Sequence, residues 1–350
     1  MRFYIVTALV TVLLLVVTIS YKQELFYSNE LPYDDEQTGL ADQKIIHFSH
    51  VVAENTPKGL AATKFAQLVE EKSNGKIIVQ IYPNSIMYHD GNEMDALRRG
   101  DVQMIAPTIS KVTSYLPNWQ VLDLPFLIET DAQLFSILHG KLGEALLAEL
   151  ELIDVKGMTF WTNGFKQMIA KDQALVDVDD FKQLTFRTMN STILEEQFTL
   201  LGGKTVVTTF NDLYHELTTD DIAGQENTLS NVYSKGYYKF HPHITLSNHG
   251  ILSYAIVMNQ NFWDSLSAEE QAIISESLDE IRIWQHEQAV AINEQNLQAL
   301  QQIDGVHIQM LSTEQRDSWK QQLEPIYDYY SSHINNNYLQ QLRQELHYTK

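Results

Sequence analysis

The sequence contains no cysteine, which excludes thiol catalysis, thiolate metal sites and disulfide bonds. The same absence excludes a lipid anchor attached to an N-terminal cysteine. Proteins that are exported into oxidising compartments risk mispaired disulfides, so a cysteine-free chain suits export without proving it.

Basic residues are few, since 24 Lys+Arg stand against 45 Asp+Glu and give a formal net charge of −21. Proteins that bind nucleic acid need a basic face that displaces counterions from phosphates. Nucleic acid is therefore not an expected partner. A small anionic ligand is still compatible with this charge, because salt screens exposed charges beyond about 8 Å.

Motifs that would support an enzymatic activity are also missing. The sequence has no glycine-rich dinucleotide loop, no Walker A loop, no G-x-S-x-G elbow and no H-E-x-x-H. His241, His243 and His249 lie close together, but no carboxylate has ligand-like spacing to them, and zinc sites need three or four convergent ligands. We predict a protein that is not an enzyme and that holds no metal and no cofactor. A hydrolase or lyase on an α/β scaffold is an alternative that product formation would reveal.

The N-terminus predicts export. Arg2 precedes an uncharged, mostly apolar run over residues 3–20, which is typical of a signal peptide. The run exceeds the usual apolar region of about 7–15 residues, and no A-x-A cleavage site follows. As a helix it would span about 27 Å, enough for a short or tilted membrane span. We predict that residues 1–20 are either a cleaved signal peptide or an N-terminal membrane anchor, and that the acidic residues 21–43 are a spacer.

From residue 44 onward, strand-like and helix-like segments alternate. KIIHFS (44–49) and KIIVQIYP (76–83) flank a helix that opens at Thr56-Pro57. MTFWTNGF (158–165) and QMIA (167–170) are predicted as separate strands further on. This alternation predicts βαβ units, an α/β fold and a mainly parallel sheet.

A capping box, Ser267 to Glu270, opens a helical pattern that extends to about Gln302. A helix of that length, about 50 Å, exceeds one small domain and could brace two.

Two cations follow strand-like segments, where open parallel sheets present their ligands. Lys166 lies in NGFKQ, and Arg187 lies in LTFRTMNS. Arginine offers a planar fork that grips a carboxylate with two hydrogen bonds, and lysine adds a compact second charge. Taken alone, Arg187 is open to two interpretations: a structural ion pair with one of the many acidic residues, or a clamp for an external anion.

Seven segments in fixed order resemble the solute-binding subunits of TRAP transporters, and in particular the DctP group that binds C4-dicarboxylates. The resemblance covers about Lys44 to Asp264 and continues weakly along the C-terminal helices. The segments are FSHVVAENTPKG (48–59), YPNSIMYHDGNEMDALRRGDVQMIAP (82–107), LDLPFL (122–127), WTNGFKQM (161–168), LTFRTMNSTILEEQF (184–198), GQENTLSN (224–231) and NHGILSYAIVMNQNFWDSL (248–266).

The resemblance implies a two-lobed periplasmic binding protein fold of the α/β class, with a hinge and a long C-terminal helix that braces both lobes. Residues 44–164 plus 253–292 would form lobe I, and residues 165–252 plus 293–350 would form lobe II.

The resemblance also implies a ligand site. Arg187 would form a salt bridge with a substrate carboxylate, and Lys166 occupies the position of the second cation. Phe210 would supply an aromatic wall and Asn227 an amide that bonds the ligand. The first lobe would contribute around His50, Thr108 and Lys111. The sequence departs from the family pattern at Ala223, which replaces the usual Asp, and at Thr228, which replaces Pro; these changes concern local structure or partner contact more than ligand charge.

The function implied is that of an exported, periplasmic receptor that captures succinate, fumarate or malate and delivers it to the small and large membrane subunits of a TRAP transporter. Two alternatives remain open: a TRAP receptor for another organic acid, and a sensor that reports its ligand to a signalling partner. An uncleaved N-terminal segment, with membrane attachment, would favour the sensor.

Overall fold

The structure is a computed structural model, and it describes residues 10–18, 43–219 and 221–348. The chain divides into two compact units, residues 1–43 and 44–350. In the first unit, residues 10–18 form a helix whose apolar side chains are exposed. The rest of the predicted signal peptide or anchor, and nearly all of the predicted spacer, lie outside the described residues. No helix in the described part of the chain is long and apolar enough to cross a membrane.

The second unit is built on one mixed sheet in the order β2-β1-β3-β8-β4-β7-β5-β6, with β9 paired to β8. The strands are β1 (Lys44–Ser49), β2 (Ile77–Tyr82), β3 (Met104–Ile105), β4 (Val155–Ala170), β5 (Thr185–Thr188), β6 (Lys204–Val207), β7 (Gly224–Asn227), β8 (His243–Asn259) and β9 (His307–Met310). The prediction of a mainly parallel sheet is wrong at the centre, where β8 is antiparallel to β3 and β4, and β4 is antiparallel to β7. Strand–helix alternation could not predict this, because β4 and β8 are joined by the long β5–β7 region and not by one crossover helix.

Two lobes share these central strands. β1, β2 and β3 lie on one side of the β4–β8 pair, and β5, β6 and β7 lie on the other. Separate apolar clusters support the two sides: one contains Phe48, Phe65 and Trp161, and another contains Phe186 and Phe198. The two-lobed α/β fold predicted from the sequence is therefore present, with β4 and β8 as the continuous connection.

β4 is one strand, although the sequence predicted two segments. Its pairing with β8 shifts register between Thr162 and Phe165, where Gly164 adopts a positive φ of 84°. Glycine reaches that conformation without the steric cost that a Cβ atom adds. A bulge of this kind bends a strand without ending it, so the strand can turn between the lobes.

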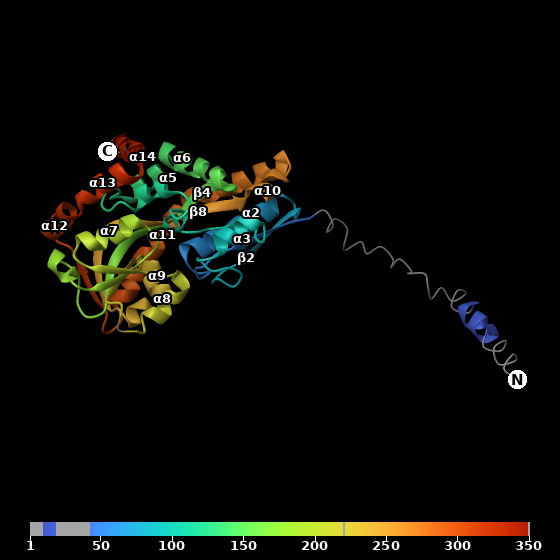
Figure 1. Ribbon diagram of the computed structural model, residues 1–350, viewed down its shortest axis with the longest axis horizontal. Coiled ribbons are helices and arrows are strands. Elements are labelled where there is room, and N and C mark those ends of the chain that lie inside the picture. The colour runs from blue at the N-terminus through green and yellow to red at the C-terminus, as the bar shows by residue number, and fades with distance from the viewer. Residues whose placement is uncertain (1–9, 19–42, 220, 349–350) are drawn as a thin grey trace. The chain divides into compact units, whose positions relative to one another are not determined.

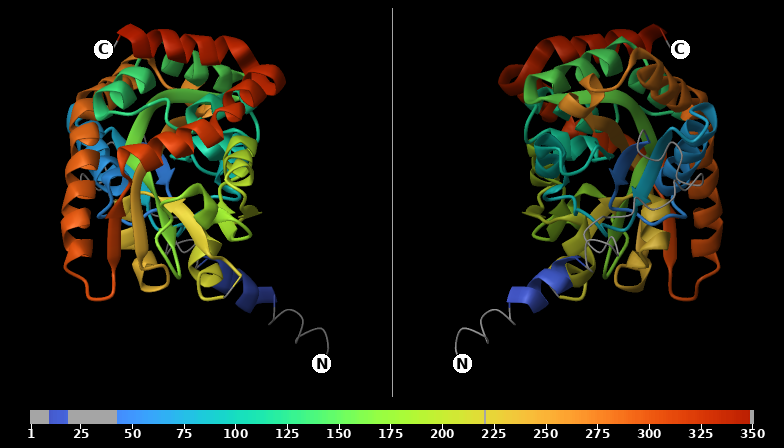
Figure 2. Two further views of the ribbon diagram at one scale, coloured as in Figure 1. Left: turned by 90° about the vertical axis from the view of Figure 1, so that its left-hand side faces the viewer. Right: turned by 90° about the vertical axis from the view of Figure 1, so that its right-hand side faces the viewer.

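The long helix α11 (Ala268–Gln301) fastens this bend. Its N-terminus has the predicted capping box, in which Ser267 and Glu270 satisfy each other's backbone N–H groups. The side chain of Gln285 accepts a hydrogen bond from the backbone N of Thr162 (2.9 Å) and donates one to the backbone carbonyl oxygen of Thr162 (2.7 Å). Figure 2 shows α11, in orange, running along one side of the folded unit. Helix α11 is therefore bonded to β4 at its bend, where the strand passes between the lobes.

The remaining α-helices cover the sheet and its edges (Figure 1). They are α2 (Pro57–Lys72), α3 (Glu93–Arg99), α4 (Ile109–Val112), α5 (Asp131–Leu138), α6 (Lys141–Glu149), α7 (Thr192–Leu200), α8 (Phe210–Glu216), α9 (Leu229–Ser234), α10 (Gln260–Asp264), α12 (Thr313–Leu323), α13 (Pro325–Tyr330) and α14 (Asn336–Tyr348).

The C-terminal helices contact elements on both sides of the central strands. Trp319 of α12 packs edge-on against Phe181, with ring centroids 4.9 Å apart, in the cluster that contains Phe186. Tyr330 and Leu342, from α13 and α14, instead share a cluster with α5 and α6. The exact division of the chain between the lobes stays a prediction.

Candidate functional site

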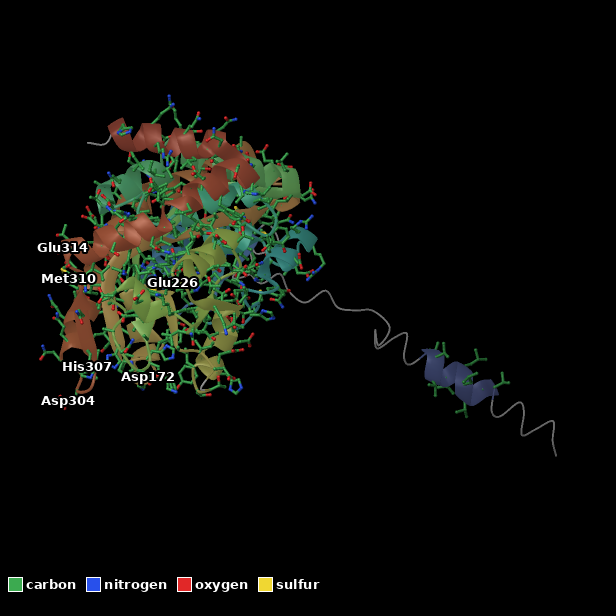
Figure 3. The ribbon with its side chains drawn as sticks, turned by 60° about the vertical axis from the view of Figure 1, so that its left-hand side comes forward. Asp172, Glu226, Asp304, His307, Met310 and Glu314 are labelled. Atoms are coloured by element: carbon green, nitrogen blue, oxygen red, sulfur yellow. The ribbon has the colours of Figure 1, made fainter. Side chains whose placement is uncertain are left out.

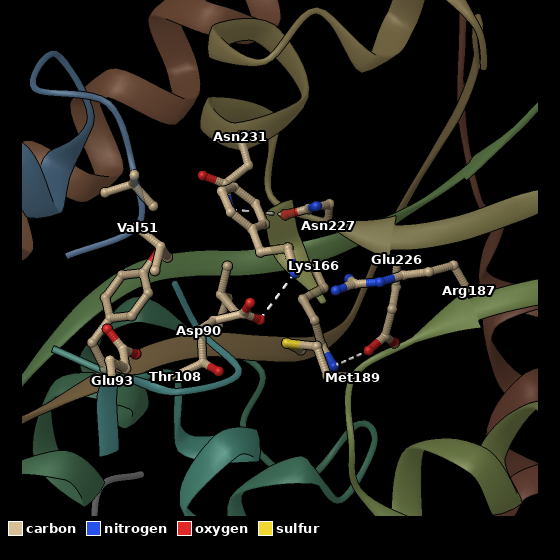
Figure 4. A pocket seen from close by; sticks show the side chains of 14 residues that line it. Val51, Asp90, Glu93, Thr108, Lys166, Arg187, Met189, Glu226, Asn227 and Asn231 are labelled. Carbon is tan, nitrogen blue, oxygen red and sulfur yellow. Dashed lines mark hydrogen bonds and ion pairs between the residues drawn. The ribbon is translucent and has the colours of Figure 1, made fainter. Parts of the chain in front are cut away.

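A cavity with about 490 Å³ of empty space, its mouth included, lies where loops and strand ends of both lobes meet. Five of the seven predicted site residues line it: Thr108, Lys166, Arg187, Phe210 and Asn227. The other lining residues are Val51, Val52, Asp90, Glu93, Met189, Glu226, Asn231, Leu252 and Tyr254. Figure 4 shows this group from close by.

Two cations line this cavity, and within the described part of the chain Arg187 is the one that has no acidic partner. β5 carries it into the interior, where its side chain is 2% exposed. Its Nε and Nη2 donate to the carbonyl oxygen of Thr208, at 3.1 and 2.7 Å. Among the described residues no carboxylate lies within 4.0 Å of the guanidinium nitrogens, and Figure 4 shows the group reaching toward the centre of the cavity. Burial lowers the pKa of Arg187, yet an arginine stays protonated in proteins.

The other predicted cation, Lys166, has its charge balanced inside the protein. Its Nζ contacts Oε1 of Glu226 at 2.5 Å, and both side chains are about 1% exposed. Oε2 of Glu226 also accepts from Nε2 of His249 (2.8 Å) and from Nε2 of Gln197 (3.1 Å). Figure 3 places Glu226 inside the folded unit, whereas His307 and Met310 lie at its periphery.

The protonation states of this cluster follow from its contacts. Burial alone would raise the pKa of Glu226, but the Lys166 ammonium and the His249 hydrogen bond outweigh it and hold that pKa well below its usual range. Burial lowers the pKa of His249, although Glu226 opposes the shift. A neutral His249 that donates from Nε2 can accept from the hydroxyl of Ser247 at Nδ1, 2.7 Å away. Lys166 and Glu226 therefore form a neutral pair at the edge of the cavity.

Gly250 makes room for the Lys166 side chain. It lies opposite Lys166 in the β4–β8 pairing, and a Cβ atom placed on it would come within 2.8 Å of Lys166 Cε. Carbon atoms in contact normally lie about 3.5–4.0 Å apart. A glycine therefore stands at position 250 because the side chain of Lys166 passes directly over it.

Asn227 and Phe210 line the cavity on the side of the second lobe. Oδ1 of Asn227 accepts from Nδ2 of Asn231 at 2.9 Å, which fixes the orientation of its amide. Phe210 begins α8, and its backbone N donates to Oδ2 of Asp90 at 2.9 Å. Asp90 comes from the loop before α3, so this bond joins the two sides of the cavity.

Two further hydrogen bonds join the two sides outside the cavity lining. Oγ of Ser85 donates to Oδ1 of Asn211 at 3.0 Å, and Oγ1 of Thr113 donates to the carbonyl oxygen of Asn190 at 2.8 Å. Both bonds join segments on opposite sides of the central strands. The two lobes therefore contact each other, both at the cavity through Phe210 and Asp90 and beside it.

Two predicted residues, His50 and Lys111, do not line the cavity. His50 is fully buried, and burial, followed by the charge of Lys58, lowers its pKa to about 3, so it is neutral. Its segment reaches the cavity through Val51 and Val52 instead. Lys111 pairs with Asp90, with Nζ 3.1 Å from Oδ2. Ligand contact by either residue stays a prediction.

Sequence reasoning missed several cavity residues, above all Glu226 and Glu93. Glu226 stands in the quoted segment GQENTLSN, but only its neighbour Asn227 was assigned a role. Its partners Lys166 and His249 lie 60 and 23 residues away along the chain. Tyr254 and Leu252 stood in a long apolar run whose pattern gave no sign that they face a ligand cavity.

Comparison with known proteins gives consistent matches over most of the chain. The family described as bacterial extracellular solute-binding protein, family 7 (DctP) matches residues 48–333. The C4-dicarboxylate-binding protein DctB of Bacillus subtilis is 39% identical over 315 residues, which cover 90% of each chain.

Two solved structures with bound dicarboxylates also match. A TRAP periplasmic solute-binding protein of Shewanella oneidensis with bound succinate is 36% identical, with a TM-score of 0.83 over 87% of this chain and 99% of the other. One from Pseudomonas aeruginosa with bound L-malate is 33% identical, with a TM-score of 0.80 over 82% and 100%.

Proposed function

The chain belongs to the DctP family of bacterial extracellular solute-binding proteins, and we propose that its cavity captures a C4-dicarboxylate such as succinate, fumarate or malate. The family consists of receptors that serve transporters and not of enzymes, which confirms the prediction that no reaction is catalysed. The ligand class is supported by a relative named for C4-dicarboxylate binding and by structures that contain succinate and L-malate.

One observation carries the assignment of the site. Arg187 is a buried cation whose guanidinium points into the cavity and has no carboxylate partner among the described residues. A buried charge without a partner is costly, and a ligand carboxylate would remove that cost. Two N–H groups are committed to Thr208, which aims the remaining fork of the guanidinium. Arg187 is thus the residue that grips one ligand carboxylate.

The other predicted residues take supporting roles. Lys166, neutralised by Glu226, offers hydrogen bonds to the ligand with no net charge. Asn227 adds an oriented amide, and Phe210 adds an aromatic wall.

Closure of the lobes is the signal that the receptor is loaded. A ligand shifts a two-state hinge only by its preference for the closed form. A carboxylate that bonds Arg187 on one side and first-lobe groups on the other has such a preference. The closed form would then dock on the small and large membrane subunits of a TRAP transporter and release the ligand there.

The family places the folded unit outside the cytoplasm. We propose that residues 1–20 direct this export, as a cleaved signal peptide or as an inner-membrane anchor, and that the receptor works in the periplasm. N-terminal sequencing of the mature protein distinguishes the two, because only cleavage exposes a new N-terminus.

A thermal-shift panel tests the proposed ligand class. The purified protein is heated with succinate, fumarate and malate, and separately with a sugar acid, an aromatic acid and the monocarboxylate butyrate. A ligand at a hundred times its Kd stabilises the folded state by about 2.7 kcal/mol, which a melting curve resolves. We expect the three dicarboxylates to raise Tm and butyrate to leave it unchanged. A response to the sugar acid or the aromatic acid alone would replace the dicarboxylate with that acid.

A further inference from the structure

Three carboxyl groups line the cavity, those of Asp90, Glu93 and Glu226, and among the described residues only Glu93 has no partner for either oxygen. Glu93, at the start of α3, lines the cavity and is 1% exposed. In the described part of the chain, neither of its carboxyl oxygens has a hydrogen-bond partner, and no cation lies within 4.0 Å of them. Figure 4 shows Glu93 on one side of the cavity and Arg187 on the other. The carboxyl group without a partner therefore lies on the side of the cavity opposite the Arg187 guanidinium.

Charged and titratable groups surround Glu93 from several elements. They are Lys58 of α2, Asp90 of the loop before α3, Lys111 of α4 and Tyr254 of β8, with Lys166, Arg187 and Glu226 across the cavity.

None of the near cations is positioned to neutralise Glu93 directly. Nζ of Lys58 donates to the carbonyl oxygen of Ala106 at 2.9 Å and lies over the ring of Tyr254, 3.8 Å from its centroid. Lys111 is paired with Asp90. Burial raises the pKa of Glu93, Asp90 raises it further, and Lys58 and Lys111 only oppose the shift.

The protonation state of Glu93 decides which ligand group can bind on its side of the cavity. An ionised Glu93 beside a second ligand carboxylate would put two like charges in a poorly solvated space, where Coulomb repulsion is far stronger than in water. A protonated Glu93 can instead donate its O–H to that carboxylate, and a hydrogen bond to an ionised acceptor is about twice as strong as a neutral one.

We propose that Glu93 meets the second carboxylate of the ligand as a protonated acid, so that the receptor binds a dianion together with one proton. This inference rests on the proposed function, because it concerns the far end of a diacid held by Arg187. It assigns one ligand carboxylate to a permanent cation and the other to a hydrogen-bond donor that exists only while Glu93 is protonated. Glu93 is then a residue that determines specificity for diacids over monoacids.

The test measures succinate binding by calorimetry at about pH 7 and about pH 9, where succinate stays a dianion. Three proteins are compared: wild type, Glu93→Gln and Asp95→Asn. Asp95 lies on the same helix but is exposed, so its variant removes one acid without touching the cavity. Repeating each titration in buffers of different ionisation enthalpy gives the number of protons taken up with the ligand.

In wild type, we expect succinate affinity to fall by up to about tenfold per pH unit once Glu93 ionises, with uptake approaching one proton per ligand at alkaline pH. Glu93→Gln keeps a neutral N–H donor, so we expect its affinity at pH 7 to stay within about threefold of wild type. Its affinity should change little up to pH 9, with no proton uptake. Asp95→Asn should behave as wild type in both measurements.

Three results would overturn the proposal. Tighter succinate binding by Glu93→Gln at pH 7 would mean that Glu93 is ionised and repels the ligand. An unchanged pH slope in Glu93→Gln would assign the titration to another group, such as Lys58. Absence of alkaline proton uptake in wild type would contradict the proposal without any variant, which covers the case of a misfolded Glu93→Gln.

Succinate binding at pH 7 separates the proposal for Glu93 from the proposed function. If wild type binds succinate at pH 7 but shows none of the expected proton linkage, the proposal for Glu93 fails and the proposed function stands. If wild type binds none of succinate, fumarate and malate, both are overturned.

Discussion

Replacement of Arg187 by alanine is the sharpest test of the proposed site. The side chain is buried, its fork is aimed by Thr208, and no described carboxylate competes for it. Truncating one partner of a buried charge pair costs about 2–5 kcal/mol. Since every 1.4 kcal/mol is a factor of ten, succinate binding should weaken by about 30-fold to about 4,000-fold.

Arg187→Lys separates charge from geometry. Lysine keeps the positive charge but loses the planar fork, and its single ammonium would have to serve both the Thr208 carbonyl and the ligand. We expect this variant to bind succinate at least about tenfold more weakly than wild type. Isothermal calorimetry with succinate gives both affinities.

The control for these variants is Arg99→Ala. Arg99 is exposed and pairs with Asp101, so its loss changes net charge equally and leaves the cavity intact. Loss of Arg187 also leaves the buried Thr208 carbonyl without its donors, which should lower stability by about 1–3 kcal/mol. Binding is therefore measured well below the melting temperature of each variant. Near-normal succinate affinity of folded Arg187→Ala would refute the assignment of this residue to the ligand.

Three further predictions concern the framework around the site. Glu226→Gln leaves Lys166 without its carboxylate and should destabilise the fold by about 3–5 kcal/mol in urea unfolding. The pKa of Glu226 in the folded state is below the 4.5 of the free side chain. The ionised Glu226 therefore adds fully to the free energy of unfolding above about pH 4.5, and this contribution is lost as pH falls further. The Glu226→Gln variant should not show this loss. Gly250→Ala places a Cβ atom 2.8 Å from Lys166 Cε, so overpacking should cost about 1–3 kcal/mol, seen as a lower Tm. Gln285→Ala removes both hydrogen bonds to Thr162 and should cost about 1–3 kcal/mol in the same assay.

Each of these predictions has a result that contradicts it. Wild-type stability in Glu226→Gln would show that the Lys166 charge is compensated by another group. An unchanged Tm in Gly250→Ala would mean that the Lys166 chain moves freely. An unchanged Tm in Gln285→Ala would mean that α11 is not needed to hold the bend of β4.

Local elements were predictable wherever their signals lie within a few residues. The strand at 44–49, the Thr56-Pro57 helix start and the capping box of Ser267 all appear as predicted. Caps and apolar periodicity act over one or two turns, so the sequence displays them directly. β4 was predicted as two segments, because Asn163-Gly164 looks like a turn when the partner strand and α11 are not known.

The sequence by itself determined the family and the α/β class, and it marked Arg187 as a candidate clamp for an anion. It did so through short ordered segments and the few cations that follow strands. Only the tertiary structure decided that Lys166 is neutralised by Glu226, that His50 is buried outside the cavity, and that Glu93 lines the cavity with no hydrogen-bond partner among the described residues. The reason is physical: whether a charge is free depends on which groups, tens of residues apart, share its desolvated surroundings. A chain's linear order does not state those distances, so the roles of these charges emerge only when β4, β7, β8 and α3 meet around one cavity.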